Sequence, residues 1–103
     1  FDWPDTGPVL EKISEEIGEL KAAMADGSNP QHVTEEYGDL LFVLVNFARH
    51  LSIDPEAALR AANAKFERRF GAIETRLQAR GKTPQSSTLA EMDALWNQVK
   101  SAE

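Results

Sequence analysis

The stretch that decides the fold runs from Asn29 to Leu51 and reads NPQHVTEEYGDLLFVLVNFARHL. Asn29 followed by Pro30 indicates a helix start, because asparagine caps the first backbone amides and proline fits the first helical position. Apolar side chains then recur every three or four residues, as on one face of a helix, at Val33, Tyr37, Leu40, Leu44, Phe47 and Leu51. Residues 40–48 are apolar on nearly every side, so we expect a subunit interface along this helix.

Three further helices are predicted from similar start and stop signals. The first follows Asp5 or Thr6 and runs to about Ala25, with Gly27 just after its end. Another starts at Asp54-Pro55 and runs to about Arg80, where Gly81 stops it. The last starts at Thr88, with Glu91 as the other half of a capping box, and residues 81–87 before it are expected to form a loop.

Each of these helices carries its own apolar stripe. The stripes are Leu10, Ile13, Ile17, Leu20 and Met24; Leu59, Ala62, Phe66, Ile73 and Leu77; and Leu89, Met92, Leu95, Trp96 and Val99. No segment shows the alternation of a strand, and the connections are short, so neighbouring helices should run antiparallel. We therefore predict an all-α, four-helix bundle-like fold.

Length and composition restrict the class of protein. The 103 residues fit one domain, 1–103, with 42% hydrophobic and 27% charged residues. A net charge of -6 argues against a nucleic-acid binder, and the absence of cysteine excludes disulfides, thiolate metal sites and a cysteine nucleophile. No stretch is long enough to cross a membrane and no signal peptide is apparent, so we expect a cytoplasmic protein.

Two acidic pairs carry the strongest chemical signal. Glu16 and Glu19 are three residues apart on the first helix, and Glu36 and Asp39 repeat that spacing on the second. This spacing places both carboxylates of a pair on one face, at the edge of each apolar stripe, so all four can converge. Because such carboxylates repel one another unless a cation lies between them, we expect magnesium, with manganese as an alternative.

A solvated charged face is the plainer explanation of either pair alone, since the chain holds 17 acidic residues. Gly18 and Gly38 favour a site, because each costs a helix roughly 1 kcal/mol relative to alanine and lies beside an acidic pair. We expect another helix or a ligand to approach closely at these glycines.

Basic and aromatic residues follow downstream. Lys65 and Arg69 are four residues apart and share a helix face that can hold phosphate oxygens, although a solvated face would look the same. Trp96 and Lys100 have the same spacing, which suits stacking of a base beside a phosphate, although a tryptophan here is more often a core residue.

The ordered motifs EEIGE at 15–19, EEYGDLLF at 35–42, VNFAR at 45–49 and NAKFERRF at 63–70 strongly resemble the MazG family of nucleoside triphosphate pyrophosphohydrolases. The start FDWP and the late EMDALW also fit. The resemblance covers nearly the whole chain and is closest to the C-terminal of the two domains of long MazG proteins.

The resemblance implies roles for individual residues. It implies magnesium ligands at Glu16, Glu19, Glu36 and Asp39, and triphosphate contacts at Lys65 and Arg69. It associates Trp96 and Lys100 with the nucleotide, places the polar Asn63 near them, and lets Lys12 face phosphate. It also implies a dimer or a dimer of dimers.

The expected reaction is hydrolysis of a nucleoside triphosphate to the monophosphate and pyrophosphate. Glu15 or a ligand carboxylate would accept the proton of the attacking water, and Lys65 and Arg69 would stabilise the leaving pyrophosphate. Two alternatives stay open. One is a related all-α pyrophosphohydrolase specific for dCTP, dUTP or phosphoribosyl-ATP, and the other is a helical interaction module without catalysis.

Overall fold

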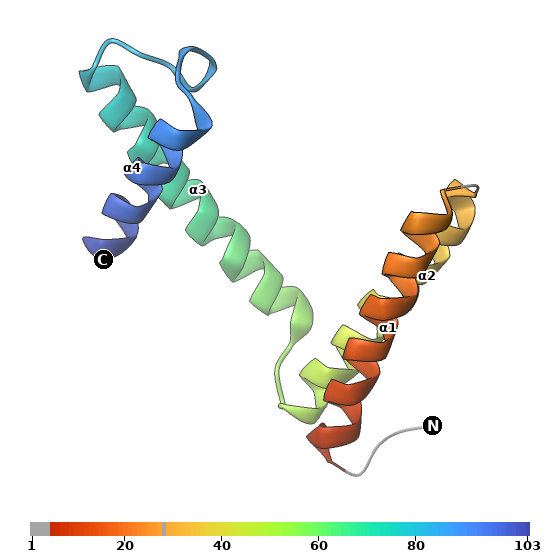
Figure 1. The fold of residues 1–103 in the computed structure, drawn as a ribbon. Coiled ribbons are helices and arrows are strands. Elements are labelled where there is room, and N and C mark those ends of the chain that lie inside the picture. Colours follow the sequence, from red (N-terminus) through yellow and green to blue (C-terminus); the bar gives the residue numbers. More distant parts are fainter. Residues whose placement is uncertain (1–4, 28) are drawn as a thin grey trace. The chain divides into compact units, whose positions relative to one another are not determined.

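A computed structural model describes residues 5–27 and 29–103 of the protein. These residues form four α-helices and one short 3-10 helix: α1 Thr6–Asp26, α2 Pro30–His50, α3 Pro55–Ala79, η1 Pro84–Ser86 and α4 Leu89–Ser101 (Figure 1). No strand occurs among the described residues, so the all-α prediction is confirmed. The FDWP start lies outside the described residues.

The helix ends follow the predicted caps. Asp5, Asn29 and Asp54 each accept a hydrogen bond from a backbone amide two residues on, at 3.0 Å, which satisfies a donor that the first helical turn leaves free. Gly27 and Gly81 adopt φ values of 65° and 70°, a left-handed conformation that glycine reaches without a steric penalty.

The connection between α3 and α4 is more ordered than the expected loop. Residues 84–86 form η1, in which Thr83 and Ser86 cap each other through side chain and backbone. Thr88 caps α4 by accepting from the Glu91 amide at 3.1 Å, but only this half of the predicted capping box forms. The Glu91 carboxylate instead accepts from Ser87 and contacts Arg80 and Lys82.

The chain divides into two compact units, Phe1–Glu56 and Ala57–Glu103. The single domain at 1–103 stays a prediction. None of the helices among the described residues has the length and apolar character that crossing a bilayer requires.

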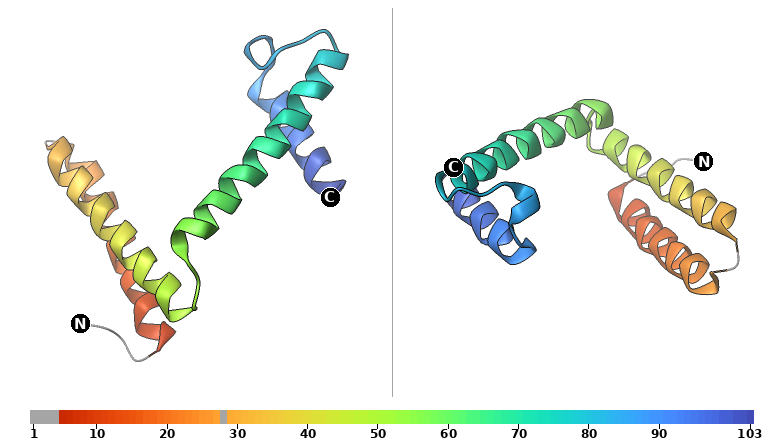
Figure 2. Two further views of the ribbon diagram at one scale, coloured as in Figure 1. Left: turned by 180° about the vertical axis from the view of Figure 1, so that it is seen from behind. Right: turned by 90° about the horizontal axis from the view of Figure 1, so that it is seen from above.

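In the first unit, α1 and α2 form an antiparallel hairpin, as both views of Figure 2 show. The buried side of α1 is rotated from the predicted stripe: Val9, Glu16 and Ala23, seven residues apart, are buried. Leu10, Ile17 and Met24, which were expected inside, are exposed. A single partner helix covers only a narrow seam of α1. The residues of this seam each precede a member of the predicted stripe by one position.

Helix α2 shows the same rotation. Val43 is its buried residue, whereas the stripe members Tyr37, Leu44 and Leu51 are exposed. Leu41, Val45 and Phe42, the last 67% exposed, also face outward. The hairpin alone therefore leaves much of α2 uncovered. The expected burial of α2 on more than one side would need a further contact surface.

In the second unit, α4 packs back on the C-terminal half of α3. Ile73 and Leu77 of α3 and Leu95 and Val99 of α4 form the core, with partly buried hydrophobic neighbours Phe70, Ala72, Met92 and Trp96. All four core residues belong to the predicted stripes of α3 and α4.

Candidate functional site

Three carboxylates converge between α1 and α2. Glu16 and Glu19 lie on successive turns of α1, and Glu36 faces them from α2 because the hairpin is antiparallel. One oxygen from each lies within 4.8 Å of the others, close enough to share one cation. The structure therefore brings three of the four predicted ligands together.

The burial of Glu16 is unusual for an acidic residue. Glu16 is only 5% exposed and occupies a seam position between Val9 and Ala23. The Oε2 atoms of Glu16 and Glu36 are buried and accept no hydrogen bond from any described group. An unpartnered buried carboxylate oxygen is costly, so these atoms are suited to bind a cation. Three hard oxygen donors suit magnesium or manganese.

The Oε1 atoms of Glu16 and Glu36 have basic neighbours. Lys12 Nζ lies 3.2 Å from Glu16 Oε1 and 3.2 Å from Glu15 Oε1. The hydrogen bond to Glu16, followed by that to Glu15, raises the pKa of Lys12. His32 Nε2 is 3.9 Å from Glu36 Oε1. Lys12, suggested as a phosphate contact, thus lies against the acidic group in this structure.

Crowding among the carboxylates affects the pKa of Glu19. The charge of Glu16 raises the pKa of Glu19, with smaller contributions from burial and from the charge of Glu36. Like charges at short range favour the protonated form, whereas a divalent cation would favour the ionised form of all three. The group is thus electrostatically arranged to take up positive charge.

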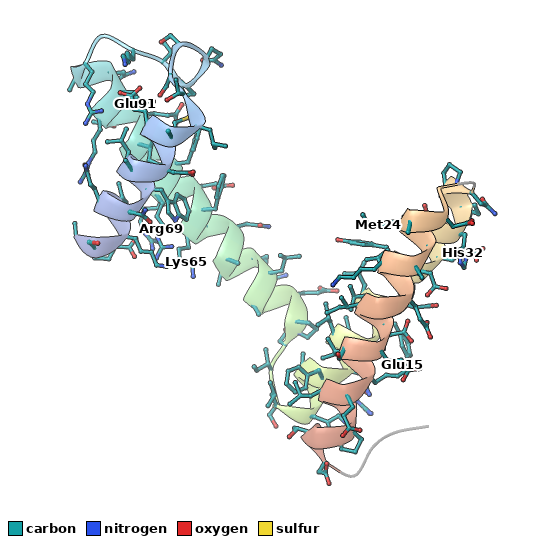
Figure 3. The ribbon with its side chains drawn as sticks, in the orientation of Figure 1. Glu15, Met24, His32, Lys65, Arg69 and Glu91 are labelled. Atoms are coloured by element: carbon teal, nitrogen blue, oxygen red, sulfur yellow. The ribbon has the colours of Figure 1, made fainter. Side chains whose placement is uncertain are left out.

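Two further predicted members lie at the margin. Asp39 is exposed on the next turn of α2 and is not part of the converging three. Glu15 points away from the seam, with its side chain 57% exposed, and contacts Lys12 (Figure 3). A Cβ atom at Gly18 or Gly38 would meet no described atom within 4 Å, so the expected close approach by another helix is absent from the described residues.

The second unit holds the basic residues. Lys65 and Arg69 lie one turn apart on α3, as predicted (Figure 3). Arg69 is engaged: its Nε and Nη2 donate to the two carboxylate oxygens of Glu103 at 2.7 and 2.8 Å. This contact raises the pKa of Arg69 and lowers that of Glu103. Lys65 is exposed.

Trp96 combines both roles that the sequence left open. Its ring packs on Phe66 with centroids 5.8 Å apart and belongs to the edge of the core. The guanidinium of Arg69 lies 5.3 Å from the Trp96 ring centroid, within range of a cation–π interaction. Asn63 and Lys100 are exposed on α3 and α4.

Two features of this unit escaped the sequence analysis. Glu103 pairs with a residue 34 positions away, so no helical spacing announces the contact. Asp93 lines a pocket with Phe66 and Trp96, but an isolated aspartate on a helix gave no signal.

Several known proteins are similar in sequence to this chain. The family model of the MazG nucleotide pyrophosphohydrolase domain matches residues 7–72, which include the acidic hairpin, Lys65 and Arg69. A nucleoside triphosphate pyrophosphohydrolase of Escherichia coli (strain K12) is 45% identical over 107 aligned residues, covering 100% of this chain and 40% of the relative.

Two further relatives are similar over most or all of the chain. The nucleoside triphosphate pyrophosphohydrolase/pyrophosphatase MazG of Thermotoga maritima is 41% identical, over 100% of this chain and 39% of its own length. The uncharacterized protein YabN of Bacillus subtilis is 41% identical over 77% of this chain and 16% of its own length. The chain spans about two fifths of the first two relatives. Because the family model covers more than half of it, this chain belongs to the MazG nucleotide pyrophosphohydrolase family.

Proposed function

We propose that the chain is a magnesium-dependent nucleoside triphosphate pyrophosphohydrolase. The observation that carries the proposal is the pair of buried, unpartnered oxygens of Glu16 and Glu36 within a group of three carboxylates. Family membership supplies the reaction class, and the names of the E. coli and T. maritima relatives supply the substrate class.

Glu16, Glu19 and Glu36 would hold the cation, and Asp39 would join them through rotation of its exposed side chain. Magnesium, or manganese in its place, neutralises phosphate oxygens and lowers the pKa of a bound water. The carboxylates would position the triphosphate by holding this cation, because an acidic hairpin without a cation would repel the phosphates.

The chain's other polar groups bind the phosphates and move the proton. Water attacks the α-phosphorus, the bond to the bridging oxygen breaks, and pyrophosphate leaves with that electron pair. Glu15 or one of the ligand carboxylates accepts the proton of the water. Lys65 and Arg69 stabilise the leaving pyrophosphate, and Asn63, Trp96, Lys100 and Lys12 are proposed as further nucleotide contacts.

We also propose a homodimer, or a dimer of dimers, formed through the helices. The support is the run of exposed apolar side chains on α2, including Leu41, Phe42 and Val45. Contiguous apolar surface of this kind is unfavourable in water and marks a contact surface.

The test is product analysis. The purified chain is incubated with magnesium and each nucleoside triphosphate in turn, including dCTP and dUTP, and the products are separated. The proposal requires nucleoside monophosphate and pyrophosphate in equal amounts. Nucleoside diphosphate with orthophosphate, or no turnover of any substrate, would overturn it. Turnover of a single substrate would favour a narrow pyrophosphohydrolase.

A further inference from the structure

Arg69 binds an anion of its own chain in this structure. Its Nε and Nη2 donate to Oε1 and Oε2 of Glu103 at 2.7 and 2.8 Å, the two-pronged geometry that a guanidinium group also forms with phosphate. The Arg69 side chain is only 12% exposed and lies 5.3 Å from the ring centroid of Trp96. Two of its five N–H donors are therefore already used by a carboxylate of the same unit.

The Glu103 carboxylate lies near more than one cation. The hydrogen bond from Arg69, and to a smaller extent the charges of Arg68 and Lys65, lowers the pKa of Glu103. The side chain is thus ionised near neutral pH and offsets part of the positive charge of this segment of α3. Because Lys65 and Arg69 are the residues proposed to stabilise pyrophosphate, Glu103 and the phosphates of the substrate compete for the same cations.

Glu103 can leave Arg69 without disturbing the core of the second unit. Residues 101–103 are exposed, and Val99 is the last core residue of α4. The Glu103 backbone amide makes a long hydrogen bond, of 3.4 Å, to the carbonyl of Lys100. Exposed helix ends of this kind open at little free-energy cost, so movement of the carboxylate requires no unpacking of α4.

We propose that Glu103 is a built-in competitor of the substrate, which occupies Arg69 while the site is empty, yields to the triphosphate and returns when pyrophosphate departs. The inference rests on the proposed function, because Arg69 is taken to bind the leaving pyrophosphate. A triphosphate brings several negative charges against one, so it displaces the carboxylate despite the high effective concentration of a group on the same chain. The return of Glu103 to Arg69 then lowers the affinity for the product.

Binding of inorganic pyrophosphate tests this competition without hydrolysis. In calorimetric titrations of the intact chain with magnesium pyrophosphate, Glu103→Gln should lower the Kd about fivefold, because the neutral side chain no longer competes as an anion. Glu67→Gln is the matched control, since it removes one exposed carboxylate from α3 and should leave the Kd unchanged. In an Arg69→Gln background, Glu103→Gln should change the Kd less than about twofold, because the two substitutions act on one interaction.

An unchanged or raised Kd in Glu103→Gln overturns the inference. If the urea unfolding midpoint falls while the Kd stays the same, Glu103 only fastens the end of α4 to α3, which overturns it as well. A full fivefold effect in the Arg69→Gln background contradicts it too, because Arg69 would not be the group for which Glu103 competes.

Product analysis on the same proteins separates this inference from the proposed function. No hydrolysis by the wild type, together with tighter pyrophosphate binding by Glu103→Gln, overturns the function and supports the competitor. Hydrolysis to monophosphate and pyrophosphate, together with an unchanged pyrophosphate Kd in Glu103→Gln, overturns the competitor alone.

Discussion

Glu16 occupies a seam position that an apolar residue would fill in an ordinary helical hairpin. It lies in the row of Val9 and Ala23, where the hydrophobic effect favours an aliphatic side chain. Only one of its oxygens has a described partner, Lys12, and the other is buried without one. Burying this carboxylate lowers the stability of the fold. Such costs concentrate at functional sites, so the burial is explained if the carboxylate binds a cation.

Arg69 gives the first prediction at the residue scale. Its donors face the carboxylate of Glu103, in the paired geometry that a phosphate would also take. Glu103→Gln should therefore lower KM for nucleoside triphosphates severalfold with little change in kcat, because a competing negative charge is removed. Steady-state kinetics with Glu67→Gln as the control will show this. A raised KM would mean that Glu103 holds Arg69 in position for the substrate.

Single residues also mark the limit of prediction from sequence. The spacing of Glu16 and Glu19 is local to α1, so the helical repeat predicts that they share a face, but not that this face is the buried seam. The Arg69–Glu103 pair joins residues 34 positions apart, and the position of Asp93 in an aromatic pocket depends on how α4 packs on α3. Contacts of this kind depend on tertiary packing, which helical periodicity does not contain.

At the scale of elements, the ends of the helices were predictable from the sequence, whereas the buried face of each hairpin helix was not. Asp5, Asn29, Asp54 and Thr88 cap the backbone within their own turn, so the signal and its cause lie together in the sequence. The buried face depends on the partner helix: Ile17 and Leu44 belong to the predicted stripes, yet both are exposed in the hairpin. The apolar pattern is wider than one partner can cover.

The connection from α3 to α4 should make the second unit sensitive to acid. Ser87, Lys82 and Arg80 bind Glu91 and lower its pKa from 4.5 to about 2. A lowered pKa in the folded state means that these contacts stabilise the protein fully above about pH 4.5 and are lost as the pH falls toward 2. Urea unfolding midpoints should fall over that interval, and Glu91→Gln should flatten the dependence. An unchanged slope in Glu91→Gln would contradict this assignment.

Substituting a helix glycine beside an acidic pair should affect stability and activity in opposite directions. Gly38→Ala should raise the free energy of unfolding by about 1 kcal/mol, because alanine favours the helix and its methyl group meets open space. If substrate approaches α2 at this point, the same change should lower kcat/KM at least tenfold.

Gly71→Ala on α3 is the matched control for Gly38→Ala. It also meets open space, but it lies outside the acidic hairpin. It should stabilise the protein similarly and keep full activity. Full activity in Gly38→Ala would show that the glycine does not serve substrate access.

At the scale of the whole molecule, the apolar surface of α2 predicts self-association. Phe42 is 67% exposed amid Leu41 and Val45. Phe42→Asp should shift the sedimentation coefficient from that of a dimer to that of a monomer, because a buried unpaired charge at an interface is strongly unfavourable. Gln31→Asp, at the exposed start of the same helix, should leave assembly intact. A wild type that sediments as a monomer at all concentrations would contradict the predicted dimer.

Magnesium binding by the acidic hairpin can be tested by thermal unfolding with and without magnesium chloride. A cation that binds only the folded state raises the melting temperature by mass action, by an amount equivalent to about 2.7 kcal/mol at one hundred times its Kd. Magnesium binding at this group predicts such a rise for the wild type and for Glu35→Gln, an exposed neighbour outside the group, and its loss in Glu36→Gln. An equal rise in Glu36→Gln, or none in the wild type, would contradict it.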